Sequence, residues 1–254
     1  MRYPSFIRQP AVMMVGERCF SEIAEKFHFD NAVCWKHVVS KGLGFLIVLG
    51  GAIVKLPQIY KIVASGSVAG LSLPAFIMET VSMSISVSYN YRNQNPFSTY
   101  GESFFLLMQN FVILLLMFLY LGRLNQAVLA AALFTLALYL LNSPTLLNGA
   151  TMALLQTATI PISLTSRVPQ ILANYRNGST GQLAAFTVLN SFIGCLVRVF
   201  TTLQEVNDPI ILAGFLMASC LHGTLAFQML YYWNAKQPYG KDPFGMSNDK
   251  KKVM

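Results

Sequence analysis

Long apolar stretches recur along the chain, separated by short segments rich in Gly, Asn, Ser and Pro. Each stretch holds about 20 residues with few charges, which is the length that an α-helix needs to cross a bilayer. The pattern predicts seven transmembrane helices, at residues 43–64, 71–92, 103–122, 125–142, 149–175, 184–204 and 210–233. We therefore expect an all-α membrane protein, with residues 1–42 and 234–254 outside the membrane.

The sequence contains an internal repeat. Residues 55–72 read KLPQIYKIVASGSVAGLS and residues 167–184 read RVPQILANYRNGSTGQLA, with six identical positions at a constant offset of 112. Each copy opens a unit of three spans, and such a unit reverses the direction of the chain. The odd span at 125–142 restores that direction. We therefore expect a 3+1+3 plan, with parallel three-helix repeats at 43–122 and 149–233 joined by a linker helix within 123–148.

Composition supports a membrane protein. Hydrophobic residues make up 54% of the 254 residues and charged residues only 11%, whereas about a quarter of a soluble domain is charged. The formal net charge of +8 lacks the clustered basic surface of a nucleic-acid-binding protein. We expect the lipid bilayer, and not nucleic acid, as a partner.

Loop charge predicts the orientation. Basic residues such as Lys61, Arg123 and Arg176 gather on the side of the spans where the C-terminus lies. Because positively charged loops tend to stay in the cytosol, we expect a cytosolic C-terminal tail and a lumenal N-terminal segment. Lys251 and Lys252, the fourth and third residues from the end, resemble the dilysine retrieval signal of endoplasmic reticulum membrane proteins. A generic basic tail is the alternative.

Each repeat carries a Pro-Gln pair inside an apolar span, at Pro57-Gln58 and Pro169-Gln170. A proline within a helix removes one hydrogen bond and kinks the helix, and the neighbouring glutamine can bond the exposed backbone. We interpret the two pairs as candidate hinges or gates. Static kinks that help the helices pack are the alternative.

Each Pro-Gln pair follows a basic residue, Lys55 in the first repeat and Arg167 in the second. A charge near the centre of a bilayer costs about 2.5–3.5 kcal/mol and marks a functional candidate. Glu79 lies at a similar depth in the next span, so a Lys55–Glu79 ion pair is expected. Ser191 occupies the equivalent position of the second repeat, which leaves Arg167 available for an anionic ligand such as phosphate. Bonding of Arg167 to carbonyl groups or to Gln156 is the alternative.

Two further pairs are candidates for structural links. Arg198 lies about two helical turns before Glu205, and we expect these residues to pair at the lumenal rim. A ligand contact of Arg198 is the alternative. Cys19 and Cys34 both lie in the N-terminal segment, and a lumenal location would allow them to form a disulfide.

The sequence contains no HExxH, Walker A or GxSxG motif and no cysteine spacing suited to zinc. Glu79 is nearly alone as a carboxylate within the spans, too few for acid–base chemistry on a sugar linkage. We therefore expect no catalytic residue, metal or cofactor, and a protein that is not an enzyme.

These motifs together resemble the PQ-loop repeat superfamily, which includes the SWEET sugar carriers, cystinosin and the KDEL receptors. The resemblance covers residues 15–237 and is closer to the branch of mannose-P-dolichol utilization defect 1 proteins. Arg167-Val168 before the second Pro-Gln pair departs from the pattern. The resemblance rests on Lys41 to Gly44, Val54 to Gln58, Gly70 to Leu73, Pro96 to Ser98 with Gly101-Glu102, Asn177-Gly178 with Thr180 to Leu183, Gln204-Glu205 with Asp208-Pro209, and Tyr232 to Lys236.

This resemblance implies an endoplasmic reticulum protein that is needed for lumenal use of dolichol-phosphate-mannose, and of dolichol-phosphate-glucose. These donors feed N-glycan precursors and GPI anchors. On this interpretation Lys55 and Arg167 bind the phosphate of the lipid. The alternatives are a carrier of a small soluble solute, with Glu79 as a proton-coupled group, and a receptor or chaperone for glycosyltransferases.

Overall fold

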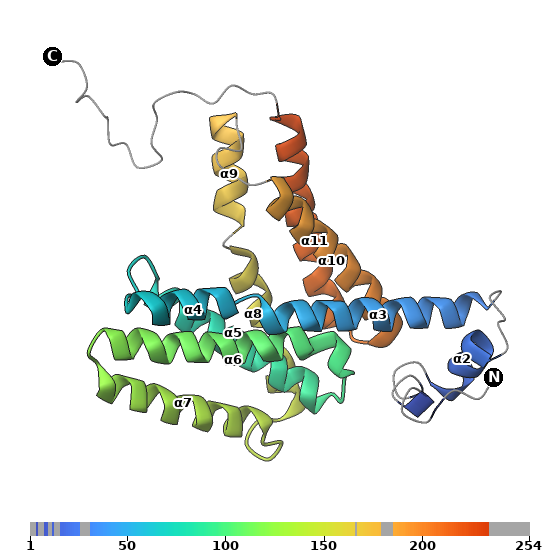
Figure 1. Ribbon diagram of the computed structural model, residues 1–254, viewed down its shortest axis with the longest axis horizontal. Coiled ribbons are helices and arrows are strands. Elements are labelled where there is room, and N and C mark those ends of the chain that lie inside the picture. Colours follow the sequence, from blue (N-terminus) through green and yellow to red (C-terminus); the bar gives the residue numbers. More distant parts are fainter. Residues whose placement is uncertain are drawn as a thin grey trace. The chain divides into compact units, whose positions relative to one another are not determined.

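The computed structural model describes residues 4, 8–9, 12, 16–25, 31–165, 167–178 and 185–233, and within these ranges all regular secondary structure is helical (Figure 1). The protein is an all-helical, multi-pass membrane protein. Its elements are α2 (Glu17–Phe20), η1 (Ser21–Glu25), α3 (Ala32–Ile53), α4 (Leu56–Ser65), α5 (Leu73–Arg92), α6 (Phe97–Tyr120), α7 (Leu124–Asn142), α8 (Gly149–Thr165), α9 (Val168–Asn177), α10 (Ala185–Glu205) and α11 (Pro209–Tyr231). The tail from residue 234, with Lys251 and Lys252, lies outside the described residues.

Each predicted span corresponds to a helix, but two of the spans are divided into two helices. The first becomes α3 and α4, and the fifth becomes α8 and α9. The helix of the first span also begins at Ala32 and not near residue 43. Its start is set by a polar cap, because the side chain of Asn31 accepts hydrogen bonds from the backbone of Val33 and Cys34 at 3.2 and 3.3 Å.

Five segments of the described chain are long and apolar enough to cross a membrane: 32–65, Phe97–Tyr120, Leu124–Asn142, Thr187–Glu205 and Pro209–Tyr231. The predicted spans at α5 and α8 fall outside this set. Helix α5 is more polar than the helices of this set, because it carries Thr80, Ser84, Ser88 and Asn90, all of them buried. Helix α8 has only 17 residues, which is shorter than each of the five segments.

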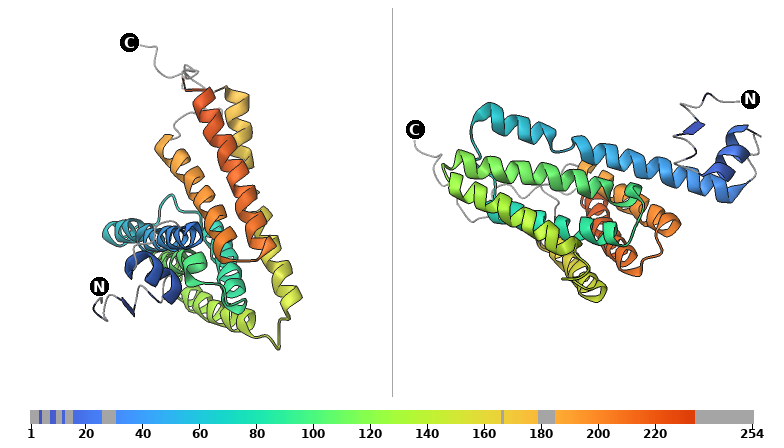
Figure 2. Two further views of the ribbon diagram at one scale, coloured as in Figure 1. Left: turned by 90° about the vertical axis from the view of Figure 1, so that its right-hand side faces the viewer. Right: turned by 90° about the horizontal axis from the view of Figure 1, so that it is seen from below.

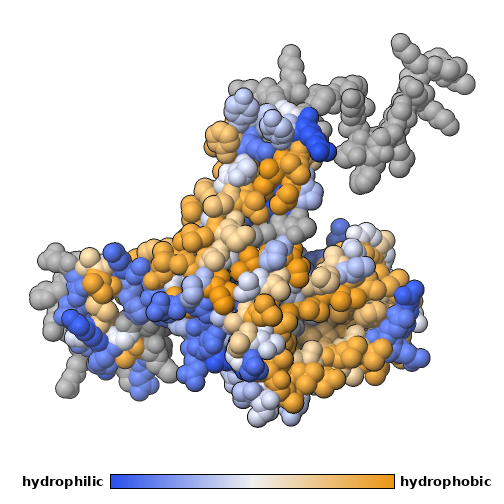
Figure 3. Space-filling view, turned by 180° about the vertical axis from the view of Figure 1, so that it is seen from behind, coloured by the Kyte–Doolittle hydropathy of each residue, from blue (hydrophilic) through white to orange (hydrophobic). Residues whose placement is uncertain are grey.

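The surface supports a lipid environment. The face drawn in Figure 3 is covered largely by apolar side chains. On α7, six large apolar residues are each more than half exposed: Leu124, Val128, Leu129, Leu133, Leu136 and Tyr139. Apolar surface of this extent is unfavourable in water and is normal for a helix in contact with lipid tails.

The helix boundaries repeat with the offset of the sequence. Helices α4, α5 and α6 begin at Leu56, Leu73 and Phe97, and α9, α10 and α11 begin at 168, 185 and 209, each 112 residues later. Helices α4 and α9 both have 10 residues and end at a glycine in the left-handed region, Gly66 with φ 60° and Gly178 with φ 59°. The two halves of the chain therefore share local structure as well as sequence.

The chain forms two compact units, residues 1–163 with 197–215, and residues 164–196 with 216–254. Within the first unit, α6 is the central helix and contacts α3, α4, α5 and α7. Helices α3 and α4 follow one another along α6, as the right-hand view of Figure 2 shows. Leu107, Ile113 and Met117 of α6 are fully buried, and the last two pack with Ile62 of α4 in the core.

Within the second unit, α9 packs against α10 and α11 through Val188, Leu225 and Met229. Two polar contacts add to this packing. Asn174 donates to Gln228 Oε1 at 3.2 Å, and Gln228 donates to the carbonyl of Ile171 at 3.1 Å. These amides therefore link helices within the second unit, as polar residues commonly do inside membranes.

The N-terminal segment is tied to α3 by a disulfide. The bond joins Cys19 in α2 to Cys34 in the first turn of α3, with Cα atoms 5.2 Å apart. Such bonds form in oxidising compartments.

Helix α3 approaches α6 closely at Gly51. A Cβ atom at this position would lie 2.7 Å from Cγ and 3.0 Å from Cα of Glu102, whereas a Cβ at Gly50 would meet nothing within 4 Å. Only glycine therefore fits at residue 51.

We predict that Gly51→Ala separates α3 from α6 and lowers the free energy of unfolding by about 1–3 kcal/mol, the usual cost of overpacking. Thermal unfolding of the purified protein in detergent measures this. Gly50→Ala is the matched control and should be neutral or slightly stabilising, because alanine favours helix more than glycine does. Equal effects of the two substitutions would contradict the close approach.

Candidate functional site

The two Pro-Gln pairs lie where membrane helices are interrupted. Lys55 and Arg167 are the N-cap residues of α4 and α9, and Pro57 and Pro169 lie in the first turns of these helices. The sequence predicted a kink in each helix, and the structure divides each span into two helices at this point, although Val54 and Lys55 both keep right-handed helical backbone. Proline suits this position because the first N–H groups of a helix lack intrahelical partners in any case.

The first break is bridged by the side chain of Gln109 from α6. In an unbroken helix the N–H of Lys55 would donate to the carbonyl of Gly51. Here Gln109 Oε1 accepts from the N–H of Lys55 at 3.0 Å, and Gln109 Nε2 donates to the carbonyl of Gly51 at 2.7 Å. The amide therefore replaces one backbone hydrogen bond with two and satisfies the N–H of Lys55 and the carbonyl of Gly51.

This bridge revises the role expected of the adjacent glutamine. The prediction assigned the exposed backbone of the first break to Gln58, yet within the described part of the chain Gln58 makes no hydrogen bond to it. The spacing of the sequence gave no direct signal for Gln109, because 54 residues separate it from Lys55.

The ammonium group of Lys55 is enclosed by polar and aromatic partners. Its Nζ lies 2.9 Å from Glu79 Oε1, donates to Asn110 Oδ1, and lies 5.4 Å from the centre of the Phe76 ring. The side chain of Lys55 is 17% exposed and that of Glu79 is 40% exposed. The structure thus brings together the two residues of the predicted intramembrane ion pair.

Arg167 has a different environment in the second unit. Arg167 is exposed, and it forms no ion pair with a carboxylate within the described part of the chain. Gln156, the alternative partner in the prediction, accepts a hydrogen bond from Ser86 at 3.0 Å.

The offset of 112 explains the difference between the two cations. The positions that match Gln109, Asn110 and Glu79 are occupied by Leu221, His222 and Ser191. The second repeat therefore lacks the amide that bridges the first break and the carboxylate that neutralises its lysine. None of the three matching residues carries a carboxylate that could neutralise Arg167.

A second charged cluster joins α3, α6 and α10. The expected Arg198–Glu205 pair is wrong, because each residue has another partner. Arg198 pairs with Glu102 Oε2 and donates to the carbonyl groups of Ser98 and Thr99 at 3.2 and 2.9 Å. Residues 198 and 205 are seven positions apart, and a direct pair would require one side chain to bend along its own helix instead of reaching the facing helix.

Glu205 binds three side chains from other helices. Its carboxylate lies 2.8 Å from Lys41 Nζ and accepts hydrogen bonds from Ser40 at 2.6 Å and Ser98 at 2.5 Å. The Glu205 side chain is 1% exposed and that of Arg198 is 7% exposed. The cluster therefore ties the C-terminal end of α10 to two helices of the first repeat.

Most of this second cluster is not predicted by the sequence. Its members Lys41, Ser98, Glu102 and Glu205 all lie in the short motifs that carry the family resemblance. These motifs therefore mark the members of the cluster. Their positions in the sequence do not show which of them pair, because residues such as Lys41 and Ser98 are more than 50 positions apart. Among the described residues, no group of three or more His, Cys, Asp or Glu side chains is arranged to hold a metal ion.

We predict that Gln109→Leu, which installs the residue type of the second repeat, destabilises the first unit. Leaving a buried N–H or carbonyl group unpaired costs about 1–3 kcal/mol for each group. Chemical unfolding in detergent measures the change. The exposed Gln126→Leu on α7 serves as control. A neutral Gln109→Leu would show that the bridge contributes nothing.

We also predict strong coupling between Lys41 and Glu205. Either Lys41→Met or Glu205→Gln alone leaves a buried polar partner unpaired and should cost about 3–5 kcal/mol, whereas the double substitution should recover part of that loss. A double-mutant cycle on unfolding free energies measures the coupling. Lys61→Met, at an exposed lysine, provides the control. Additive effects would contradict a direct pair.

Comparison with known proteins agrees with the repeat. The family model of the PQ loop repeat matches residues 39–99 and 151–211, two ranges that are again 112 residues apart. The human protein "Solute carrier family 66 member 3" is 30% identical over 186 residues, which cover 71% of this chain and 88% of that protein. No solved structure matches the chain. The matched repeats, each with a Pro-Gln pair at a helix break, and the relative that aligns along most of its length show that the chain belongs to the PQ-loop repeat family.

Proposed function

We propose that the protein supports lumenal use of dolichol-phosphate-mannose, and of dolichol-phosphate-glucose, by binding the phosphate of the lipid at Arg167. The observation that carries the proposal is the exposed arginine at the second helix break, which has no carboxylate partner among the described residues. A guanidinium group can bind a phosphate through two parallel hydrogen bonds.

The local backbone favours the same ligand. Arg167 is the N-cap residue of α9, whose first N–H groups carry partial positive charge. Interrupted membrane helices use such ends to bind anionic groups of substrates. A charged arginine beside a helix N-terminus therefore gives two sources of attraction for one phosphate.

We assign Lys55 a smaller part in phosphate binding than the sequence suggested. Its ammonium group already has Glu79 and Asn110 as partners, so a phosphate would have to displace one of them. We assign Lys55 to the stability and movement of the first break, and Arg167 to recognition.

The identity of the lipid rests on the ordered motifs of the mannose-P-dolichol utilization defect 1 branch, from Lys41 to Lys236. We further propose an endoplasmic reticulum location with a lumenal N-terminus and a cytosolic C-terminus. The Cys19–Cys34 disulfide supports a lumenal N-terminal segment, since that compartment is oxidising.

Transport of a small soluble solute is the second candidate. It is favoured by the identity of 30% to a protein named as a solute carrier. In this alternative Glu79 would take up a proton and release Lys55, which would couple proton movement to the first break. A receptor or chaperone for glycosyltransferases is a third candidate and needs no ligand at Arg167.

We predict that Arg167→Gln impairs the use of dolichol-linked mannose in cells that lack the native protein, with truncated lipid-linked oligosaccharides accumulating. Loss of a charged hydrogen-bonded contact should weaken phosphate binding about tenfold or more. Arg176→Gln, at the other end of the same helix, is the control and should restore a normal profile. A normal profile with Arg167→Gln would favour the receptor or chaperone.

Purified protein in liposomes separates the remaining alternatives. Labelled dolichol-phosphate-mannose should change sidedness if the protein translocates the lipid, and should bind without changing sidedness if the protein presents it to enzymes. Uptake of a soluble sugar or amino acid, with no binding of the dolichol lipid, would replace the proposal by the solute carrier.

A further inference from the structure

Helices α10 and α11 both pass from one compact unit of the chain to the other. The boundary falls after Leu196 in α10 and after Phe215 in α11, and each helix is continuous there. The third connection between the units lies in the last turn of α8, directly before α9. The second repeat is therefore divided between the units, whereas α4, α5 and α6 of the first repeat lie wholly within the first unit.

Both helices are held by side chains on each side of the boundary. In the first unit, Arg198 of α10 pairs with Glu102 of α6, and Ile211 of α11 lies in an apolar cluster with residues of α5 and α8. In the second unit, Val188 of α10 packs in one cluster with Leu225 of α11. Because the two ends of each helix have different partners, a movement of one unit relative to the other has to bend α10 and α11 near the boundary.

Each of these helices carries a glycine beside the boundary, Gly194 in α10 and Gly214 in α11. A Cβ atom at Gly194 would meet nothing within 4 Å, and one at Gly214 would lie 3.5 Å from Ile160, an ordinary van der Waals distance. Packing therefore requires glycine at neither position. Because glycine is less stable than alanine in a helix interior, both helices are locally weakened next to the boundary.

A third glycine of the second repeat has a different role. A Cβ atom at Gly223, inside the second unit, would lie 3.1 Å from the ring of Phe192, so this glycine allows close packing. The positions of the first repeat that match Gly194 and Gly214 hold Ser82 and Glu102, and the helices that carry them do not cross the boundary. The two glycines thus occur where the second repeat is divided.

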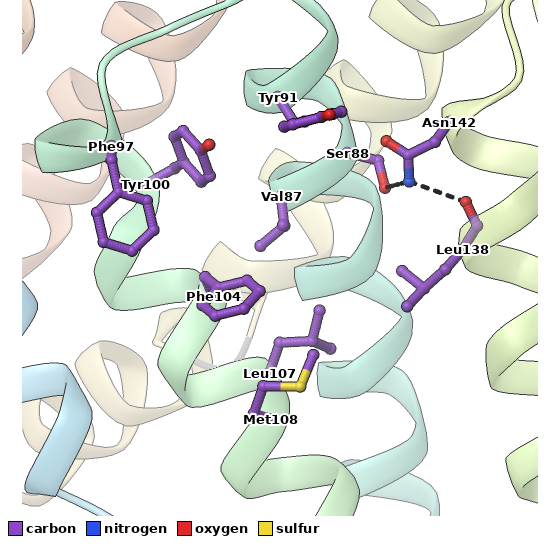
Figure 4. Close-up of a pocket in the computed structure, with 10 residues that line it drawn as sticks. All are labelled: Val87, Ser88, Tyr91, Phe97, Tyr100, Phe104, Leu107, Met108, Leu138 and Asn142. Carbon is purple, nitrogen blue, oxygen red and sulfur yellow. Dashed lines mark hydrogen bonds between the residues drawn. The ribbon is translucent and has the colours of Figure 1, made fainter.

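The first unit is joined internally by polar side chains. Asn142 of α7 donates to Ser88 Oγ of α5 at 3.0 Å, beside a cavity of about 330 Å³ (Figure 4). Arg92 of α5 donates to the carbonyls of Leu141 and Leu147 at 3.1 and 2.7 Å. These bonds tie α5 to α7 and to the segment before α8, so we expect the first unit to behave as one body.

We propose that the second unit, formed by α9, residues 185–196 of α10 and residues 216–231 of α11, moves as one body relative to the first. Bending occurs at Gly194, at Gly214 and at the end of α8, and the contacts within each unit persist. Arg167, the N-cap residue of α9, belongs to the second unit and moves with it. The movement therefore changes the surroundings of the residue to which we assign phosphate binding.

The test measures distances between pairs of spin labels by double electron–electron resonance. The purified full-length protein carries Cys195→Ala and Cys220→Ala, which removes the two cysteines outside the disulfide. Labels at Tyr139→Cys of α7 and Tyr175→Cys of α9 join the units, and labels at Leu46→Cys of α3 and Tyr139→Cys lie within the first unit. All three labelled side chains are more than half exposed. The pair that joins the units should show a second distance population, and the pair within the first unit should show one.

Gly194→Ala or Gly214→Ala should lower the second population relative to the first about four- to fivefold, which is the difference in helix propensity expressed as an equilibrium ratio. The matched control is Gly50→Ala of α3. It also replaces a helical glycine whose Cβ would meet nothing within 4 Å, but it lies inside the first unit and should leave the populations unchanged. Thermal unfolding of both alanine variants should occur at or above the temperature of the wild type.

The proposal is overturned if the pair that joins the units shows one population as narrow as that of the pair within the first unit. It is also overturned if neither alanine variant changes the populations, if Gly50→Ala acts like Gly194→Ala, or if the alanine variants unfold at lower temperature, because the glycines would then serve packing. The measurement contains no ligand, so its result is independent of the role proposed for Arg167.

Discussion

The first repeat depends on the side-chain amide of Gln109. This amide makes two hydrogen bonds, to the N–H of Lys55 and the carbonyl of Gly51, in place of the backbone hydrogen bond that these two groups would form in a continuous helix. Backbone groups inside a membrane cannot form hydrogen bonds with water. An interrupted helix is therefore stable only where other protein groups form hydrogen bonds with its unpaired N–H and carbonyl groups. Gln109 meets that requirement from the central helix α6, close to the point where Gly51 allows α3 and α6 to approach. The break, the helix contact and the position of Lys55 are therefore parts of one arrangement.

The two repeats use the same backbone plan with different polar groups. Both have a basic N-cap residue, a proline in the first turn and a ten-residue helix that ends at a left-handed glycine. In the first repeat an amide and a carboxylate satisfy the break, whereas leucine and serine occupy the matching positions of the second. The two repeats thus share local backbone structure, and the difference in side chains gives Lys55 a carboxylate partner that Arg167 lacks among the described residues.

Much of this organisation follows from the sequence because the repeat is encoded locally. The offset of 112 locates the starts of α9, α10 and α11, and the depth of Glu79 points to Lys55. The start of α3 was missed because Asn31 caps the helix well before the apolar run begins. The partners of Gln109, Arg198 and Glu205 were missed for another reason. They depend on how distant helices face each other, which neither hydropathy nor spacing along one helix determines.

The equal lengths of α4 and α9 have a further consequence. In each repeat the basic residue precedes the left-handed glycine by the same number of positions, Lys55 before Gly66 and Arg167 before Gly178. A helix advances about 1.5 Å and turns about 100° with each residue. Inserting or deleting one residue between the cation and the glycine would therefore rotate the break by about 100° relative to α6 or α11, even though all the other residues are unchanged. In these two segments, the number of residues constrains the protein at least as strongly as their identity.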